Sequence, residues 1–400
     1  MNSKILLITT FLLVFSLGLF AQQQTTDGGY IFGGNTNSYT HGSGDLLLYK
    51  LGADLKKQWR KNYGGEEPEA YAQVIQTSDG GYVVCGSSES YSNGKMDFLV
   101  YKLDASGQKQ WRKNFGGYNE DDSCSIAQTS DGGFIVAGDT DSYGNGGMDF
   151  LVYRLDAGGQ KLWRKTYGGI HDEGFGFISP TSDGGFVICG YSDSYSNGDD
   201  DFLVYKLSAT GAKLWRKNYG GDMAEWAMSV RQTTDGGYVV AGWSNSYAAP
   251  PLGRMVPANP DFLVYKLDAA GQKQWRKNFG GSESDRCYDI RQIHDGGFVV
   301  TGDSESYNQG AGDLDFLVYR LDANGQKLWR RNYGGMDNDF GFRIFQTASL
   351  RFMLVGDGRS YNQTGSDSDL LLYNINTSGG MKWYKNFGGD MNETAFSHLY

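Results

Sequence analysis

The sequence predicts an all-β fold, a seven-bladed β-propeller of four-stranded antiparallel blades, on the basis of three observations. A unit of about 50 residues recurs seven times, which is typical of propellers, solenoids and arrays. Glycine supplies 59 of the 400 residues, a frequency that excludes a helical bundle because glycine weakens helix interiors. Aromatic residues make up 14% of the chain, and this density argues against disorder because such side chains need a core.

A tryptophan marks each unit, and we expect it to pack between neighbouring blades. The seven copies are separated by 52 to 60 residues and lie at Trp59, Trp111, Trp163, Trp215, Trp275, Trp329 and Trp383. A second segment, SDGGYVVCG at residues 78–86, recurs in step with the tryptophan. The two segments define the same repeat independently.

Each unit contains four strand signals separated by turns. In the second unit we expect strands over residues 71–77, 82–85, 98–103 and 109–115. The Ser-Asp-Gly-Gly run at 78–81 and the Asp-Ala-Ser-Gly run at 104–107 are turn signals, because glycine and aspartate favour the backbone angles of tight turns. Four strands joined in this way predict one antiparallel sheet per unit.

The positions of the chain ends favour a closed ring over an open solenoid. The first unit starts at its second strand, near residues 30–32, and the chain ends inside a first strand at residues 394–400. The C-terminal strand therefore joins the N-terminal blade and removes two exposed sheet edges. We expect residues 22–400 to form this single propeller domain.

Residues 1–21 are predicted to be a signal peptide. Lys4 precedes an apolar run at residues 5–20, and Ala21 precedes three glutamines. The alternative is a membrane anchor, but 16 apolar residues are few for a membrane span. We therefore expect cleavage near Ala21, a secreted protein in the extracellular space or periplasm, and no membrane span in the mature chain. The four cysteines show no disulfide or metal-binding pattern, which favours buried free thiols.

The charge balance restricts the partners. The chain has 36 basic and 46 acidic residues and a formal net charge of -10, which argues against phosphate-based nucleic-acid binding. We expect a monomer that binds a glycan or an extracellular protein.

Two sets of acidic residues recur in all seven units. The first set precedes or begins the first strand and consists of Glu69, Asp121, Glu173, Glu225, Asp285, Asp339 and Glu393. We expect it to surround the mouth of the central channel, where it would anchor loops, bind cations or catalyse hydrolysis. Glu225 and Asp285 are the catalytic candidates of the last alternative. The second set precedes the third strand and consists of Asp45, Asp97, Asp149, Asp201, Asp261, Asp315 and Asp369.

Loop anchoring is the favoured role of the second set, and Ca²⁺ binding is the alternative. Asp193, Asp199 and Asp201 are the candidate metal ligands, and Ca²⁺ is the cofactor that they would bind. The four histidines fall at unrelated repeat positions, so they predict no metal cluster.

Departures from the repeat indicate ligand binding. Trp226 and Trp243 are the two tryptophans outside the repeat, and both lie in the fifth unit. The same unit has Tyr247 and a proline-rich loop at 248–260 that contains Arg254. These residues predict an aromatic platform for a sugar or peptide, or alternatively a small core beneath the loop.

Arginines in units five to seven are a second departure. Arg231, Arg291 and Arg343 occupy first-strand positions that are expected to face the channel, together with Asp289. They would neutralise the acidic set or hold an anionic ligand group, and we name Arg231 and Arg291 among the candidate ligand-binding residues.

The repeat resembles known propeller families. The run Ser106-Gly107-Gln108-Lys109-Gln110-Trp111 resembles the Gly-x-x-x-Trp docking motif of quinoprotein-like bacterial propellers, and the DGGYVVAG-type strand resembles kelch blades in layout. Over residues 25–400 the chain is similar to secreted bacterial propellers with "TSDGGYIVAG…W…YGG" repeats. The resemblance implies the propeller fold, but seven blades and no vicinal cysteine pair depart from quinoprotein dehydrogenases. The leading hypothesis is a secreted, non-enzymatic binding propeller; the alternative is a carbohydrate-active hydrolase or lyase.

Overall fold

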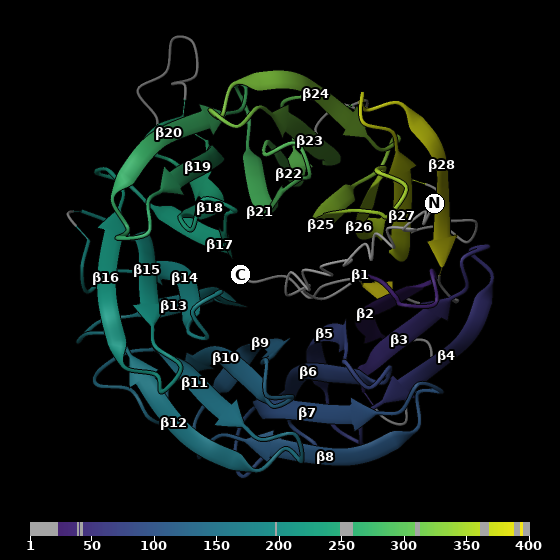
Figure 1. Cartoon of the computed structure of the whole chain (residues 1–400), viewed down its shortest axis with the longest axis vertical. Helices are drawn as coiled ribbons and strands as arrows, with labels where there is room; N and C mark the ends of the chain where they lie inside the picture. The colour runs from purple at the N-terminus through teal and green to yellow at the C-terminus, as the bar shows by residue number, and fades with distance from the viewer. Residues whose placement is uncertain are drawn as a thin grey trace, which may run out of the picture.

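The computed structural model is a closed ring of seven antiparallel sheets, which confirms the predicted seven-bladed propeller (Figure 1). The structure describes residues 23–37, 40, 43–196, 198–248, 259–308, 313–360, 368–387 and 393–394. Within these ranges every regular element is a β-strand, and none of them contains a helix capable of crossing a membrane. The predicted signal peptide at residues 1–21 lies outside the described residues.

Blades 2 to 4 each have four strands, which follow one another in chain order from the centre of the ring to its outside. Blade 2 consists of β5 (Glu69–Gln76), β6 (Tyr82–Ser88), β7 (Asp97–Leu103) and β8 (Lys109–Phe115). Blade 3 consists of β9 (Asp121–Gln128), β10 (Phe134–Thr140), β11 (Asp149–Leu155) and β12 (Lys161–Tyr167). Blade 4 consists of β13 (Glu173–Pro180), β14 (Phe186–Ser192), β15 (Asp201–Leu207) and β16 (Lys213–Tyr219).

Blades 5 to 7 repeat this order. Blade 5 consists of β17 (Glu225–Gln232), β18 (Tyr238–Ser244), β19 (Asp261–Leu267) and β20 (Lys273–Phe279). Blade 6 consists of β21 (Asp285–Gln292), β22 (Phe298–Ser304), β23 (Asp315–Leu321) and β24 (Lys327–Tyr333). Blade 7 consists of β25 (Asp339–Gln346), β26 (Phe352–Gly358), β27 (Asp369–Ile375) and β28 (Met381–Phe387).

Blade 1 is closed by both ends of the chain. Its strands β2 (Tyr30–Thr36), β3 (Asp45–Leu51) and β4 (Lys57–Tyr63) are continuous in sequence. The inner edge of β2 pairs with β29 (Glu393–Thr394), which confirms the predicted closure, and also with β1 (Gln23–Gln24), which the sequence did not predict. The two short strands together take the place that β5 fills in blade 2, and residues 395–400 lie outside the described part of the chain.

The repeated tryptophan packs against the next blade, as predicted. The Trp59 ring on β4 meets Tyr82 of blade 2 edge to face, with ring centroids 5.7 Å apart. A side chain at Gly107, in the turn that precedes β8, would lie 3.2 Å from the same indole, and Gly107 has a φ of 76°. Glycine therefore fits this turn for two reasons, its backbone angle and the closeness of the indole. All four cysteines are free and buried, also as predicted.

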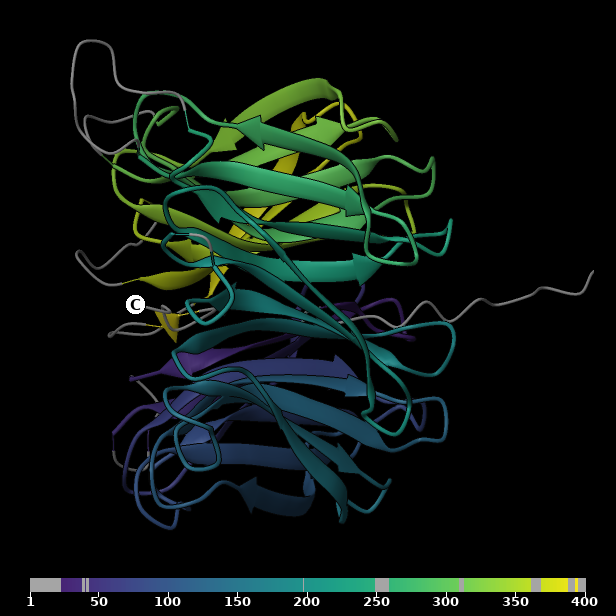
Figure 2. The same cartoon turned by 90° about the vertical axis from the view of Figure 1, so that its left-hand side faces the viewer.

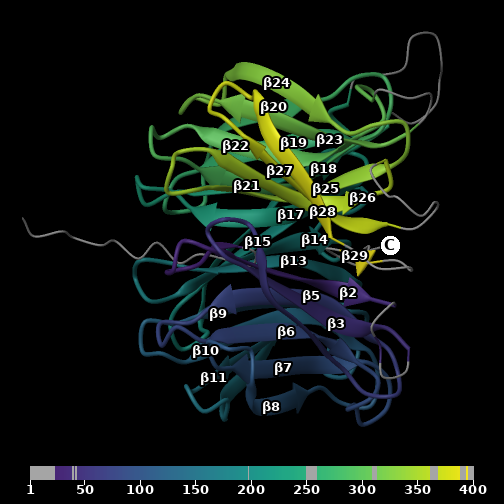
Figure 3. The same ribbon diagram turned by 90° about the vertical axis from the view of Figure 1, so that its right-hand side faces the viewer.

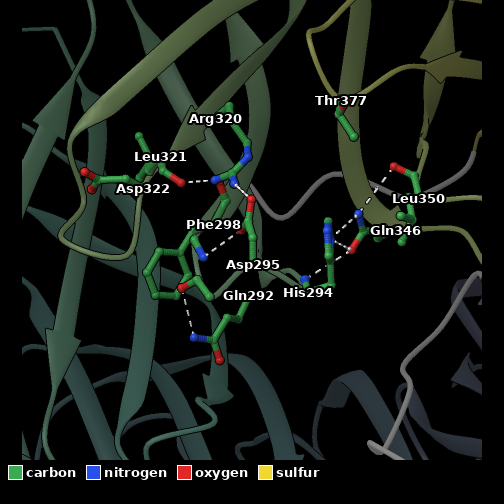
Figure 4. A network of polar contacts seen from close by, with 12 residues as sticks. Gln292, His294, Asp295, Phe298, Arg320, Leu321, Asp322, Gln346, Leu350 and Thr377 are labelled. Carbon is green, nitrogen blue, oxygen red and sulfur yellow. Dashed lines mark hydrogen bonds and ion pairs between the residues drawn. The ribbon is translucent and has the colours of Figure 1, made fainter.

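The turns that follow the first strands are linked from blade to blade. In blade 6 the carboxylate of Asp295 binds Arg320, which is buried on β23 (Figure 4). The backbone N–H of His294 in the same turn donates to Oε1 of Gln346 at the end of β25, at 3.3 Å. The same glutamine donates to the carbonyl of Leu350 in its own turn. One side chain thus joins two neighbouring blades.

The ring has two different faces, because neighbouring strands are antiparallel (Figures 2 and 3). The tight turns after the first and third strands of each blade lie on one face, which we call the turn face. The connections after the second strand and between blades lie on the opposite face, which we call the loop face. Longer connections concentrate on the loop face, where variable residues are expected.

Candidate functional site

The first acidic set anchors loops within the blades. The Glu69 carboxylate is buried and accepts hydrogen bonds from Oγ of Ser88 at 2.6 Å and from the backbone N–H of Gly65 at 2.9 Å. Glu225 makes the equivalent contacts with Ser244 and Gly221, at 2.7 Å each. Asp285 likewise accepts from a serine hydroxyl and a glycine N–H. These hydrogen bonds agree with the favoured loop-anchoring role, and Glu225 and Asp285 make the same kinds of contact as Glu69.

The second acidic set is also buried at loop ends. Asp97 accepts from the backbone N–H of Asn93 at 3.2 Å, and Asp201 accepts from Nδ2 of Asn218 at 3.2 Å. Asp193 and Asp199 are exposed in the connection that precedes β15. Among the described residues, no group of three or more His, Cys, Asp or Glu side chains is arranged to hold a metal ion.

Tyr247 makes the contacts of a repeated structural tyrosine. Its hydroxyl donates to the carbonyl of Gly220, and the Arg276 guanidinium lies 3.6 Å from its ring centroid. Tyr91 of blade 2 makes the same pair of contacts, with Gly64 and Arg112. Arg254 and most of the proline-rich loop at 248–260 lie outside the described residues.

The arginines of blades 5 to 7 gather around Asp289 on the innermost strands. Asp289 is fully buried and pairs with Arg231 at 3.3 Å and with Arg291 at 3.2 Å. Ser229 donates to the same carboxylate at 2.9 Å. Burial would raise the pKa of Asp289, but Arg291, Arg231 and Arg343 outweigh it and hold the pKa below its usual value. This cluster joins blades 5 and 6 near the centre of the ring.

One pair of facing positions differs in every blade, although its neighbours are constant. The second residue of the first strand lies opposite a residue near the end of the second strand, directly beside the first acidic set. We call these pairs the rim pairs; they are Thr394/Asn35, Ala70/Ser87, Asp122/Asp139, Gly174/Tyr191, Trp226/Trp243, Arg286/Asp303 and Phe340/Asp357. A position that varies inside a repeated framework is not required by the fold.

Three aromatic rings from the rim pairs of blades 4 and 5 form one stack. The Tyr191 and Trp226 rings are nearly parallel, with centroids 4.3 Å apart and an interplanar angle of 11°. Trp243 lies against Trp226 with centroids 4.9 Å apart. Gly174 makes room for this arrangement, because a Cβ at that position would lie 1.9 Å from Cε1 of Tyr191. We call Tyr191, Trp226 and Trp243 the aromatic stack; all three side chains are half-buried.

Carboxylates flank the aromatic stack. The Trp226 indole N–H donates to Oδ2 of Asp200 at 3.0 Å, and the backbone N–H of Phe175 donates to Oδ1 of Asp139 at 2.5 Å. Asp122 lies opposite Asp139 in the rim pair of blade 3. Burial, and then the negative charges of Asp139 and Asp200, raise the pKa of Tyr191, so both carboxylates act on the stack. We call Asp122, Asp139 and Asp200 the acidic flank.

The acidic flank carries perturbed carboxyl groups. Burial raises the pKa of Asp122 to about 6, although Ser123 donates to it at 2.7 Å. Burial likewise raises the pKa of Asp200 to about 6, and burial followed by the charge of Asp122 raises that of Asp139 well above its usual value. Ser123 has a φ of 61°, which non-glycine residues adopt rarely and often at functional positions.

The structure brings together only part of the predicted site. Trp226 and Trp243 are in contact as expected, but they are half-buried rather than exposed, and Arg231 and Arg291 lie in the separate Asp289 cluster. Sequence reasoning missed Tyr191, Asp122 and Asp139. The available signal was the variable residue that follows each member of the first acidic set.

The comparisons with known proteins agree with the observed fold. Residues 96–253 match the PQQ_2 family, described as outer membrane protein assembly factor BamB. The structure of a puromycin hydrolase is similar with a TM-score of 0.51 and 11% identity, over 93% of this chain and 55% of that chain. The WD40 domain of Neurospora crassa Pan2 gives a TM-score of 0.49 and 13% identity, over 84% of this chain and 86% of that one.

At this identity, the likeness to the puromycin hydrolase structure concerns the fold alone. No curated protein sequence matches the chain. The seven-bladed ring shows that the chain is a β-propeller repeat protein, and residues 96–253 are similar to the PQQ_2 family.

Proposed function

We propose that the chain is an exported, non-enzymatic binding protein that recognises a glycan or an extracellular protein through the aromatic stack on its loop face. The observation that carries this proposal is the variation of the rim pairs within an otherwise repeated framework. Hydrogen bonds and ring packing account for the constant positions, whereas the fold does not require Tyr191, Trp226 and Trp243. Clustered aromatic side chains of this kind are enriched at recognition sites.

Two further observations support export and a binding role. The apolar run at residues 5–20 after Lys4 has the layout of a signal peptide, and the matching family is described as an outer membrane protein assembly factor. The first acidic set is engaged in loop anchoring, and Glu225 and Asp285 make the same kinds of contact as Glu69. Catalysis needs one or two acids in a special environment, so this set favours binding over hydrolysis.

The test is a binding screen with a double variant of the aromatic stack. Glycan and peptide arrays are probed with the purified protein and with Trp226→Ala/Trp243→Ala. We expect the variant to lose at least tenfold in affinity for every ligand found. Tyr118→Ala serves as the matched control, because Tyr118 is an aromatic residue on the same face, 80% exposed and outside the stack. Unchanged affinity of the double variant, with its thermal unfolding intact, would refute the assignment.

A further inference from the structure

The charged groups that act on the acidic flank and on Tyr191 are carboxylates. The groups that raise the pKa of Asp200 after burial are Asp199, Asp193 and Asp172, and those that act on Asp122 are Glu120 and Asp121. Among the described residues, none of the ion pairs of the structure involves a member of the acidic flank. The stack therefore lies in a negative local field.

Blade 6 provides the contrast within the same ring. Its rim pair places Arg286 opposite Asp303, so a cation of the chain faces the carboxylate there. Blade 3 has the same carboxylate position, Asp139, but its opposite residue is a second acid, Asp122. Two facing carboxylates repel each other when both are ionised, and either a proton or a cation relieves the repulsion.

We propose that the aromatic stack and the acidic flank bind the positively charged side chain of a basic peptide segment, lysine or arginine, on an extracellular partner protein. This inference rests on the proposed binding function and specifies the chemical class of its ligand. Cations are attracted to the faces of tryptophan and tyrosine rings, and carboxylates supply the matching charge. A neutral sugar could stack on the rings and donate its hydroxyls to the carboxylates, but it would not offset their charge, so the charges favour a basic peptide over a neutral glycan.

The overall charge of the protein is consistent with such a partner. The chain has a formal net charge of -10, and a negative surface attracts basic segments and accelerates their association. The net charge of the whole protein attracts basic segments to any acidic part of its surface, however. The test must therefore separate the acidic flank from the general charge of the surface.

The experiment measures fluorescence anisotropy of three labelled peptides of equal length, rich in lysine, arginine or serine, with the purified protein. We expect the two basic peptides to bind, and the serine-rich peptide to bind at least tenfold more weakly. Asp122→Asn/Asp200→Asn should reduce the affinity for the basic peptides at least tenfold. Glu66→Gln/Glu67→Gln is the matched control, because it removes the same charge from exposed loop-face residues and should change the affinity less than twofold.

Two outcomes would overturn the inference. One is an equal loss of affinity in both acidic variants, which would mean that binding depends on general charge alone. The other is a neutral oligosaccharide that binds through Trp226 and Trp243 and is unaffected by Asp122→Asn/Asp200→Asn; the proposed function would then stand without the cationic ligand. Quenching of tryptophan fluorescence by the lysine-rich peptide, absent in Trp226→Phe/Trp243→Phe, is the independent readout if the acidic variant does not fold.

Discussion

Gln24 near the N-terminus accepts a hydrogen bond from the backbone N–H of Ala348 in blade 7, at 2.8 Å. Gln76 of blade 2 makes the equivalent contact with Thr26 of blade 1. Gln24 therefore occupies the repeat position of the last residue of a first strand, while Glu393 occupies that of the first residue. The innermost strand of blade 1 is assembled from both ends of the chain.

Truncation of the C-terminal end tests the contribution of β29 to ring closure. A chain that ends at Asn392 loses the pairing of Glu393 and Thr394 with β2, which leaves that part of the edge unpaired. We expect a lower unfolding midpoint, with a loss of about 1–2 kcal/mol for two strand pairs. A chain that ends at Thr394 keeps both pairs and is the control. Equal midpoints for the two truncated chains in urea would show that β29 does not stabilise the ring.

Asp289 is expected to be the most sensitive polar residue near the centre of the ring. Asp289→Asn keeps the shape but removes the charge that Arg231 and Arg291 contact in a buried environment. Loss of one partner of a buried ion pair typically costs about 3–5 kcal/mol. Ser229→Ala removes only a hydrogen bond to the same carboxylate, and about 1 kcal/mol is expected. Chemical denaturation should rank the two variants in this order, and the reverse order would contradict the account.

The fold was predictable because the repeat makes each feature visible seven times. The tryptophan spacing, the glycine turns and the incomplete first unit together predicted seven blades and their closure. The site was less predictable, because it depends on which side chains of neighbouring blades meet. Tyr191 has room to stack on Trp226 because its partner on the neighbouring strand of the same blade is Gly174, and the sequence shows that glycine without showing its contact.

The acidic residues illustrate the same limit. Their repetition indicated loop anchoring, and Glu69 and Glu225 do begin innermost strands, but the sequence did not show that their carboxylates are buried against their own loops. Asp122 and Asp139 were overlooked because they are far apart in the repeat unit: Asp122 lies on β9 and Asp139 on β10. Only the strand register places them opposite each other.

The ion pair between Lys102 and Asp79 can be tested with the residues that replace it in blade 7. In blade 2 the buried Lys102 binds Asp79 at 2.9 Å. Blade 7 has Asn374 and Ser349 at these two positions, so both charges are replaced together there. We expect Asp79→Ser to cost about 2 kcal/mol, because it leaves Lys102 buried without its carboxylate.

The double variant Asp79→Ser/Lys102→Asn should be more stable than the sum of the two single variants predicts, by about 1 kcal/mol or more. Urea denaturation of the four proteins in the cycle measures this coupling. Strict additivity would mean that the pair makes no net contribution and that its joint replacement in blade 7 has another cause.

The pH dependence of stability follows from two groups of carboxylates with opposite shifts. Burial raises the pKa of Asp303 to about 7, although Arg286 faces it, and burial raises that of Asp97 to about 6. Between the unfolded value near 4 and these values the native state binds more protons, so stability falls as the pH rises through this range. The Asp79 carboxylate behaves in the opposite way: burial would raise its pKa, but Thr77 and Lys102 hold it at about 2.

The unfolding temperature is therefore expected to be highest near pH 5. It should fall on both sides of this maximum: toward pH 8, and also below pH 4, where the turn carboxylates become protonated. Because one pKa unit corresponds to about 1.4 kcal/mol and only the two pH units between 5 and 7 contribute, Asp303 accounts for at most about 3 kcal/mol of the difference between pH 5 and pH 8. Thermal unfolding of the wild type and of Asp303→Asn across this range tests the assignment. The variant should gain less on acidification from pH 8 to pH 5, and an equal gain in both proteins would exclude Asp303 as the source.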